Sequence, residues 1–252
     1  MSNATGFHTA GTLLDLETGK QNIVAVIGCG GKTALISSLA NELRHKKVLV
    51  TTTTKIYPMA GNDIVFCTTE QDCLKHKPVN GIQNLGVLNK ASGKLEALSH
   101  DLLEKIIQLY DLVLIEADGS KALPCKGWLS SEPVIPPYCT GIVGVVSLAA
   151  LGKPADENTV FRLGEFLKLT GLRQGDVITR QALTDMVNAN MGMFHNSADN
   201  STNKRSIFVN QVEDENCAII TKEWLKGIKE LTGERFFRLA YGSARMNKWS
   251  GL

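Results

Sequence analysis

The sequence predicts an α/β fold of the P-loop NTPase type, a three-layer sandwich around a mostly parallel sheet with a helical insertion near 153–204. Short aliphatic runs alternate with longer helical periods, as they do in βαβ units. The run at 22–27 leads directly into a glycine-rich segment and a helix, and the run at 112–115 ends in acidic residues. We expect residues 13–252 to form one domain that contains the insertion, after a flexible extension over 1–12.

In the first half, the spacing of Leu35, Leu39 and Leu43 predicts a helix after the first strand. The apolar run at 112–115 predicts a central strand that is buried on both faces. The other elements expected here are strands at 47–51, 64–67 and 84–88, helices at 70–75 and 101–110, and a hairpin over 89–98 that turns at Ser92–Gly93.

In the second half, a proline-rich loop over 119–139 precedes a strand at 142–148. The helix expected at 159–169 ends at Thr170–Gly171, a sequence typical of a helix C-cap. A polar, mobile loop is expected over 192–204. The remaining expected elements are helices at 180–188 and 216–231, a strand at 206–209 and a last strand at 235–240.

The composition is that of a globular chain, with 43% hydrophobic and 21% charged residues. A net charge of +2 does not favour nucleic acid or an anionic membrane as a partner, so we expect neither. Apolar stretches stay shorter than the roughly 18 residues that a membrane span needs, and the N-terminus lacks the pattern of a secretory signal. The six cysteines form no C-x-x-C pair and the five histidines are scattered, so we expect free thiols in a reducing cytoplasm and no zinc site.

The glycine-rich segment Gly28-Cys29-Gly30-Gly31-Lys32-Thr33 has the order strand, loop, helix that binds phosphate. Glycines let backbone amides converge on phosphate oxygens, and the helix N-terminus adds its dipole. Lys32 is expected to reach the β- and γ-phosphates of a nucleotide, and the Thr33 hydroxyl to ligate Mg²⁺. The loop is two residues shorter than the usual G-x-x-x-x-G-K-[ST] and resembles the loop of the Mur ligases, which are ATP-dependent amide-forming enzymes. The alternative is a glycine-rich turn without a ligand.

Acidic residues follow the apolar run at 112–115, as in a Walker-B strand. We expect Asp118 first and Glu116 second as the Mg²⁺ ligand, directly or through water. Glu116 alternatively orients an attacking water. Both acids are also compatible with simple turn or helix caps.

The threonine run at 51–54 and Lys55 follow another strand, at the edge of the sheet where ligands bind. Thr53 or Lys55 is expected to contact the γ-phosphate or the metal. Threonine is also simply a favourable strand residue, so both interpretations stay open.

These motifs identify a resemblance to the YqeC family, described as selenium cofactor biosynthesis or selenium-dependent hydroxylase accessory proteins, over about Leu13 to Ala240. The resemblance implies a role in the maturation of selenium-dependent molybdenum hydroxylases, with such an enzyme as client. It is carried by the glycine-rich loop, by Thr52-Thr53-Thr54-Lys55, by Glu116-Ala117-Asp118-Gly119-Ser120-Lys121, by Lys126, by Glu132-Pro133-Val134-Ile135-Pro136 and by Asn210-Gln211-Val212-Glu213.

Basic side chains after the acidic strand are candidates for a second site. Lys121 or Lys126 would neutralise transition-state charge or bind an anionic second substrate, and Arg162 is a weaker candidate. The resemblance favours Lys126 and Glu132 over the alternative of a solvated basic loop.

Asn210-Gln211-Val212-Glu213 resembles the N-K-x-D guanine-binding motif of GTPases, with Glu in place of Asp. Because Asp214 is adjacent, the register stays open, and so does the choice between ATP and GTP. Cys29 is either a loop filler or a thiol that the helix N-terminus makes reactive.

Three functions are compatible with these residues. The first is an enzyme that uses ATP or GTP and Mg²⁺ for hydrolysis or for phosphoryl, nucleotidyl or ligase-type transfer, with Lys32, Glu116, Asp118 and Lys126 as catalytic candidates. The second is a nucleotide-gated chaperone that delivers selenium or molybdenum cofactor to a client. The third is a binding module that keeps the fold without the nucleotide.

Overall fold

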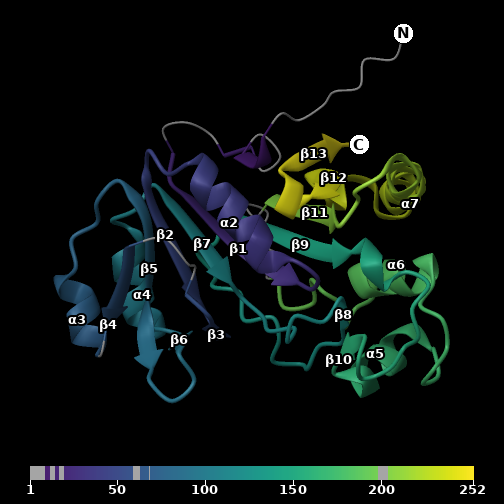
Figure 1. The fold of residues 1–252 in the computed structure, drawn as a ribbon, viewed down its shortest axis with the longest axis horizontal. Helices are drawn as coiled ribbons and strands as arrows, with labels where there is room; N and C mark the ends of the chain where they lie inside the picture. The colour runs from purple at the N-terminus through teal and green to yellow at the C-terminus, as the bar shows by residue number, and fades with distance from the viewer. Residues whose placement is uncertain (1–8, 12–14, 17–19, 59–62, 68, 198–203) are drawn as a thin grey trace, which may run out of the picture.

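A mostly parallel sheet covered by helices on both faces forms the centre of the molecule (Figure 1). The computed structural model describes residues 9–11, 15–16, 20–58, 63–67, 69–197 and 204–252. The sheet has the strand order β13-β12-β11-β9-β1-β7-β2-β5-β6-β3, with β4 beside β5. The predicted α/β sandwich is thereby confirmed.

Parallel pairs join β1, β7, β2, β5 and β4 on one side and β9, β11 and β12 on the other. The predicted hairpin is present, because β6 runs antiparallel to β5. The strands of the sheet are β1 (Asn22–Gly28), β2 (Lys47–Thr52), β3 (Lys55–Ile56), β4 (Asp63–Cys67), β5 (Gly81–Asn89), β6 (Lys94–Glu96), β7 (Leu112–Glu116), β9 (Gly141–Ser147), β11 (Lys204–Asn210), β12 (Arg238–Ser243) and β13 (Lys248–Gly251).

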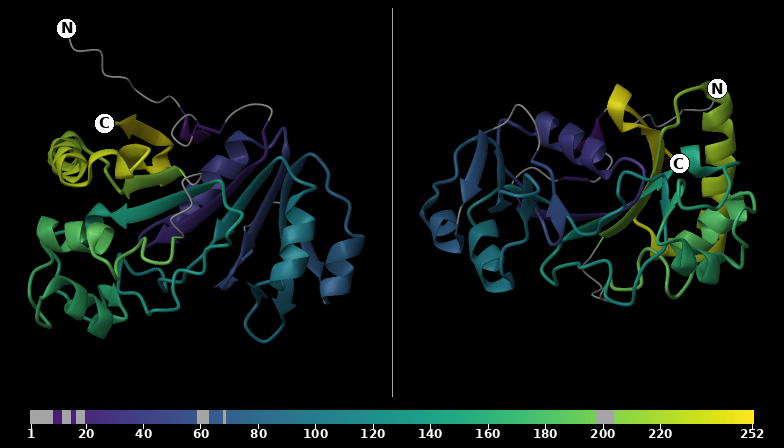
Figure 2. Two further views of the ribbon diagram at one scale, coloured as in Figure 1. Left: turned by 180° about the vertical axis from the view of Figure 1, so that it is seen from behind. Right: turned by 60° about the horizontal axis from the view of Figure 1, so that its bottom comes forward.

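Helices cover the two faces unequally. On one face lies α2, and on the other lie α4, α6 and α7, as the two views in Figure 2 make visible. Beyond the tip of β9 lies the α5–α6 pair (Figure 1). The helices are α2 (Lys32–Glu42), α3 (Glu70–Lys75), α4 (His100–Ile107), α5 (Leu163–Thr170), α6 (Arg180–Asn188) and α7 (Glu215–Thr232), with short 3₁₀ turns at Leu148–Ala150, Gly233–Arg235 and Ala244–Met246.

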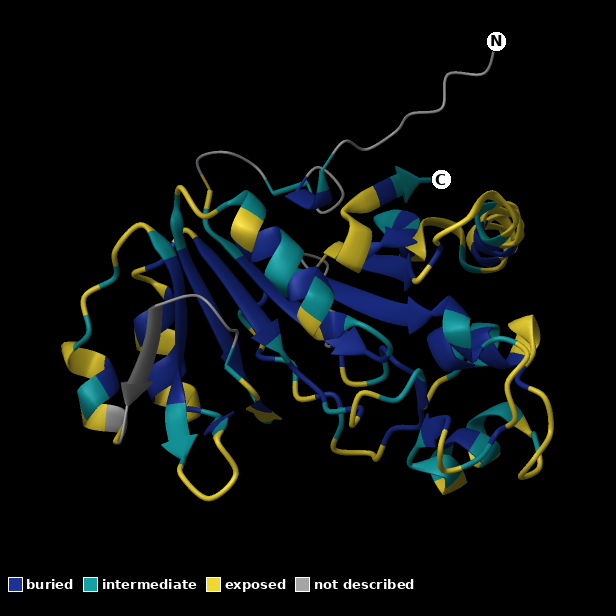
Figure 3. Cartoon of the chain, in the orientation of Figure 1, coloured by how far each residue is buried: buried dark blue, intermediate teal, exposed yellow. Residues whose placement is uncertain are grey.

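The apolar residues of β1 separate into two cores because side chains alternate across a strand. Ile23 and Ile27 belong to the core under α4, α6 and α7, whereas Val24 and Val26 belong to the core under α2. This central strand is buried on both sides (Figure 3), which explains its nearly continuous apolar sequence. The glycine-rich loop therefore follows a strand that is buried along nearly its whole length.

The start of α5 differs from the expectation. A helix was predicted over 159–169, but α5 begins at Leu163. Val160–Phe161 instead form β10, which pairs with β8 (Cys125–Lys126), and Arg162 has a φ of 58°. A left-handed residue cannot continue a right-handed helix, so the helix begins only after it. Pairing with a distant segment thus overrides the helical pattern.

Two more expectations near the C-terminus are wrong in part. The strand predicted at 235–240 is β12, displaced to Arg238–Ser243, and the antiparallel β13 follows it. The loop predicted over 192–204 is polar only in part, because Met193 and Phe194 are buried and the Phe194 ring lies 5.2 Å from that of Phe236. Residues 198–203 of that loop lie outside the described part of the chain.

The described part of the N-terminal segment contacts α2. Ala10 is buried, and the Gly11 amide donates to the Glu42 carboxylate at 3.0–3.1 Å. Residues 1–8 and 12 of the extension lie outside the described residues. Among the helices that are described, none has the length and apolar character needed to cross a bilayer.

Candidate functional site

The candidate site lies at the carboxyl edge of the sheet. Parallel strands end at the same edge, so the residues that follow them meet there. β1 ends at Gly28, β7 at Glu116 and β11 at Asn210, and all three belong to the parallel part of the sheet. Segments far apart in the sequence therefore surround the glycine-rich loop.

The loop amides divide into two sets. The Gly28 amide donates to the Asp118 carboxylate at 3.1 Å and the Cys29 amide to the Val145 carbonyl at 3.0 Å, so both face the protein body. Within the described part of the chain, the amides of Gly30, Gly31, Lys32 and Thr33 have no hydrogen-bond acceptor, and no side chain caps α2. Adjacent unpaired donors at a helix N-terminus are an arrangement that favours anions.

Only glycine fits at the turn into α2. Gly31 has a φ of 126°, and a Cβ there would collide with the side-chain amide of Asn210. Asn210 holds the loop from this side, because its Nδ2 donates to the Gly30 carbonyl at 2.9 Å. The backbone is thereby fixed with its free amides outward, so Asn210 supports the loop through the Gly30 carbonyl.

Lys32 is folded back onto the loop. Its Nζ donates to the Gly28 carbonyl at 2.7 Å and to Ser120 Oγ at 3.3 Å, and it lies 3.2 Å from Asp118 Oδ1. Burial lowers the pKa of Lys32, but the charges of Asp118 and Glu116 outweigh burial and raise it. The ammonium group therefore stays charged beside the free amides.

Asp118 is buried among donors. Its carboxylate accepts from the Gly28 amide, from Trp128 Nε1 at 2.9 Å and from Lys126 Nζ at 3.1 Å, in addition to Lys32. Burial raises the pKa of Asp118, but the two lysines and these donors outweigh burial and lower it. Asp118 is the first Mg²⁺ ligand predicted from the sequence, but both of its oxygens are engaged by these donors.

Glu116 instead contacts the threonine of the loop. Thr33 Oγ1 donates to Glu116 Oε2 at 3.2 Å. Two oxygens that ligate one Mg²⁺ at about 2.1 Å and at right angles lie about 3 Å apart, so this pair fits one ion. Burial, the largest effect, raises the pKa of Glu116, and the opposing charge of Lys32 reduces that shift. Among the residues described, no three His, Cys, Asp or Glu gather to hold a metal, so phosphates and water would complete the Mg²⁺ shell.

Lys126 lies behind the loop and not at its open side. It is fully buried, and its Nζ contacts the Gly119 carbonyl at 2.7 Å and Glu132 Oε2 at 3.5 Å besides Asp118. Glu132 in turn pairs with Arg162 at 2.7 Å. We expected Lys126 to neutralise phosphate charge; its position makes it a partner of Asp118. Lys121 is exposed and stacks on the Phe161 ring at 5.2 Å.

The threonine run and Lys55 diverge. Thr52 Oγ1 and the Thr53 amide both donate to the Glu116 carbonyl, at 2.8 and 3.2 Å, and the Thr53 hydroxyl donates to the Val134 carbonyl. These bonds fix the end of β7 on which Glu116 stands. Lys55 pairs with Glu96 of the hairpin at 2.7 Å, so the structure does not bring its side chain to the loop.

Cys29 points inward from the loop. Its side chain is fully buried in the core and lies against Cys125, whose pKa is raised by the hydrogen bond with Cys29 and by burial. The side chain of Cys29 therefore serves as packing. Among the cysteines described, Cys29, Cys73, Cys125, Cys139 and Cys217 are free thiols.

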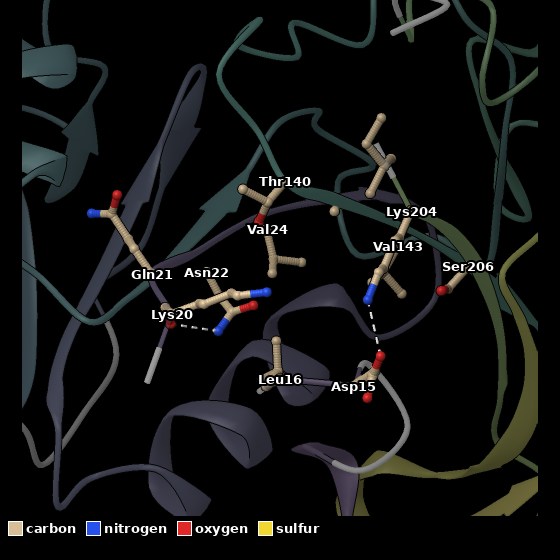
Figure 4. Close-up of a pocket in the computed structure, with 12 residues that line it drawn as sticks. Asp15, Leu16, Lys20, Gln21, Asn22, Val24, Thr140, Val143, Lys204 and Ser206 are labelled. Atoms are coloured by element: carbon tan, nitrogen blue, oxygen red, sulfur yellow. Dashed lines mark hydrogen bonds and ion pairs between the residues drawn. The ribbon is translucent and has the colours of Figure 1, made fainter. Parts of the chain in front are cut away.

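A hollow of about 210 Å³ lies at the opposite edge of the sheet (Figure 4). It is lined by the amino ends of β1, β9 and β11, including Asn22, Gly141 and Ser206, with the Lys204–Asp15 ion pair beside it. Because the glycine-rich loop follows the carboxyl end of β1, this hollow is separate from the candidate site.

Several further side chains around the loop have no role predicted from the sequence. Trp128 and Ser120 contact Asp118 and Lys32, and Ser147 donates to Gln211 beside Gly30. The Ala244 amide donates to Asn210 Oδ1 at 2.9 Å. Ser120 and Gln211 stand in stretches that carry the family resemblance, although no contact is predicted for them there. Ser243 and Ala244 lie beyond the predicted end of the last strand at Ala240.

The fold and the site together define an α/β protein whose sheet carries a glycine-rich loop, a buried lysine and an acid–threonine pair at one edge. A family model described as "YqeC protein" matches residues 24–164, more than half of the chain. The chain belongs to the YqeC family.

A relative supports the same family over a longer stretch. The chain is 28% identical over 228 residues to the uncharacterized protein YqeC of Escherichia coli (strain K12). The alignment covers 86% of this chain and 87% of the relative. No solved structure matches the chain. The matched part holds the glycine-rich loop and Glu116, and the alignment length reaches well beyond the family model.

Proposed function

We propose that this protein binds a nucleoside triphosphate with Mg²⁺ at the glycine-rich loop. The contact between Thr33 Oγ1 and Glu116 Oε2 at 3.2 Å carries the proposal, because these two oxygens are of the kind that Mg²⁺ prefers and Thr33 belongs to the loop with four unpaired amides. In this arrangement Thr33 and Glu116 hold the ion, and the amides of Gly30 to Thr33 hold phosphate oxygens. Mg²⁺ supplies charge neutralisation between the phosphates.

Lys32 acts on the phosphates in this proposal. Its ammonium group now donates to the Gly28 carbonyl and faces Asp118. A phosphate oxygen at the free amides offers it a charged acceptor, and charge-assisted hydrogen bonds are about twice as strong as neutral ones. Asp118 keeps the lysine charged and tethers the loop through the Gly28 amide.

The bound triphosphate serves hydrolysis or a phosphoryl, nucleotidyl or ligase-type transfer. Such reactions depend mainly on positioning and on neutralising phosphate charge, which Lys32, Thr33 and Glu116 provide. We further propose, from the resemblance to the YqeC family, that the reaction serves the maturation of selenium-dependent molybdenum hydroxylases. ATP and GTP both fit the phosphate site.

A nucleotide-gated chaperone is the second candidate, and one observation favours it. Ion pairs run from Asp118 through Lys126 and Glu132 to Arg162, the residue that precedes α5. This series of ion pairs connects the glycine-rich loop to the helical region, so a conformational change caused by nucleotide at the loop can reach α5. Under this alternative, intrinsic hydrolysis is slow and a client enzyme accelerates it.

Calorimetric titration with Mg-ATP and Mg-GTP tests the proposal. We expect the wild type to bind at least one of them, and Lys32→Met to lose binding at least about tenfold. Lys105→Met is the matched control, because Lys105 is exposed on α4 and its loss should change nothing. A bound triphosphate at 100 times its Kd should also raise the free energy of unfolding by about 2.7 kcal/mol.

The proposal fails if neither nucleotide binds, or if Lys32→Met and Lys105→Met bind equally well. Turnover measured with and without a client hydroxylase then separates the enzyme from the chaperone.

A further inference from the structure

Two loops meet beside the phosphate loop, on the side away from Glu116. One follows β11 at Asn210–Glu213, and the other follows β12 at Ser243–Ala244. Asn210 joins them, because its Nδ2 donates to the Gly30 carbonyl and its Oδ1 accepts from the Ala244 amide, both at 2.9 Å. Its side chain is 4% exposed, so this amide is a fixed, buried connection between the phosphate loop and the β12 loop.

The residues after Asn210 alternate between core and solvent. Val212 is buried and its amide donates to the Gly242 carbonyl at 2.8 Å, whereas Gln211 and Glu213 are exposed. Gln211 has a φ of 66° and accepts a hydrogen bond from Ser147. The backbone anchor at Val212 therefore presents Gln211 and Glu213 to solvent next to the phosphate loop.

Glu213 is oriented by the β12 loop. Ser243, which is buried, donates through Oγ to Glu213 Oε1 at 3.3 Å. The neighbouring acid has a different role, because Asp214 caps α7 by accepting from the Cys217 amide at 2.8 Å. Both carboxylates are exposed, but Asp214 is engaged in the cap of α7, so Glu213 is the carboxylate of this loop that stays available to a ligand.

The chemistry of this carboxylate selects among bases. Guanine presents N1–H and the N2 amino group side by side, and an ionised carboxylate accepts from both. Adenine has a bare N1 and no amino group at C2, so it offers Glu213 no such pair. A base that leaves the carboxylate unpaired in a partly desolvated site loses affinity.

We propose that the nucleotide of this protein is a guanine nucleotide, with Glu213 reading N1–H and the N2 amino group and Asn210 tying this base site to the phosphate loop. This inference rests on the proposed function, since it assigns the base of the triphosphate held there. It identifies GTP over ATP as the substrate class.

Competition calorimetry with Mg-GTP, Mg-ATP and Mg-XTP tests the inference. We expect the wild type to bind GTP about 10- to 100-fold more tightly than ATP. In xanthine a C2 carbonyl replaces the amino group, so an amide side chain complements it. Glu213→Gln should therefore weaken GTP binding at least about tenfold and favour XTP over GTP, with ATP binding unchanged.

Glu215→Gln is the matched control, because Glu215 is exposed in the first turn of α7 and should not affect any nucleotide. Equal or tighter binding of ATP by the wild type overturns the guanine assignment and leaves the proposed function standing. The assignment is also overturned if Glu213→Gln weakens GTP and ATP equally. Failure of every triphosphate to bind refutes the proposed function and the guanine assignment with it.

Discussion

Replacing Asp118 by alanine should destabilise the protein more than a single substitution usually does. The side chain is fully buried and is the shared partner of Lys32, Lys126, Trp128 and the Gly28 amide. Its removal takes away the closest carboxylate of two buried ammonium groups, and leaves Lys126 with Glu132 at 3.5 Å and Lys32 with the charge of Glu116. We expect the free energy of unfolding to fall by about 3–5 kcal/mol.

The magnitude follows from the distances. At 3.1–3.2 Å from Asp118 to each lysine, and with an effective dielectric constant of about 20, each pair contributes about 5 kcal/mol of Coulomb attraction. Desolvation of the three ions offsets several kcal/mol per ion, which is why the net value of the intact cluster is small. Removing only the acid abolishes the attraction and keeps the desolvation of both lysines.

Urea denaturation at neutral pH, followed by circular dichroism and tryptophan fluorescence, measures the change. Glu96→Ala is the control, because its ion pair with Lys55 lies at the surface and its loss should leave the midpoint almost unchanged. A loss below about 1 kcal/mol for Asp118→Ala would refute the reasoning, because the cluster would then not depend on its acid.

The same cluster has a defined pH dependence. Burial raises the pKa of Asp118, but Lys32 and Lys126 outweigh burial, so the net pKa lies below its ordinary value of 3.8. The stabilisation by this carboxylate is therefore present above 3.8 and is lost as the pH falls through the lowered pKa. Denaturation curves of Asp118→Asn and wild type should converge in that acidic range.

Three further predictions concern the loop and the core. Glu116→Gln should weaken Mg²⁺ binding in the presence of nucleotide at least about tenfold in calorimetry. Wild-type Mg²⁺ affinity should fall as the pH drops through the pKa of Glu116, which burial raises above 4.5, whereas the Gln variant should show no such step. Gly31→Ala should lower the free energy of unfolding in urea by about 1–3 kcal/mol, because the added Cβ collides with Asn210. Gly93→Ala should lower it less, because a Cβ there meets no atom within 4 Å, and equal losses in the two variants would contradict the collision. Burial raises the pKa of Cys139 to about 12, so iodoacetamide at mildly alkaline pH should modify it only on unfolding, and rapid labelling of the folded protein in peptide mapping would disprove this.

Local signals made the first half of the site predictable. β1, the glycine-rich loop and α2 follow one another within a short segment, and each has its own pattern of apolar or glycine residues. The acidic end of β7 was equally visible, and parallel pairing with β1 places Glu116 beside Thr33. Sequence reasoning could therefore place both acids near the loop.

The roles of the two acids could not be read from the sequence. Asp118 turns inward because Lys126 and Trp128 return to it from the segment after β7, where β8 pairs with β10. That pairing joins residues some thirty-five positions apart and leaves no periodic pattern. Which carboxylate lies beside Thr33 thus depends on long-range packing.

The far end of the chain illustrates the same limit. β12 continues through Gly242, whose positive φ of 156° suits glycine, although Tyr-Gly-Ser has the composition of a turn. The position of Ser243 and Ala244 beside Asn210 emerges only when β11 and β12 pair.

The two hydrogen bonds of the Asn210 side chain connect the glycine-rich loop to the last strands of the sheet, so the proposed base site and the proposed phosphate site come from different parts of the sequence. The residues of the proposed phosphate site lie within 24–164, the part that the family model matches, whereas Asn210, Glu213 and Ser243 lie outside it. If the proposed guanine site is correct, a substitution at Glu213 or Ser243 should change the choice of nucleobase while leaving the glycine-rich loop and Glu116 unchanged, whereas Asn210 also contacts the loop. A set of chimaeras that exchange only 205–252 between relatives would inherit their preferred base from the donor of that final segment.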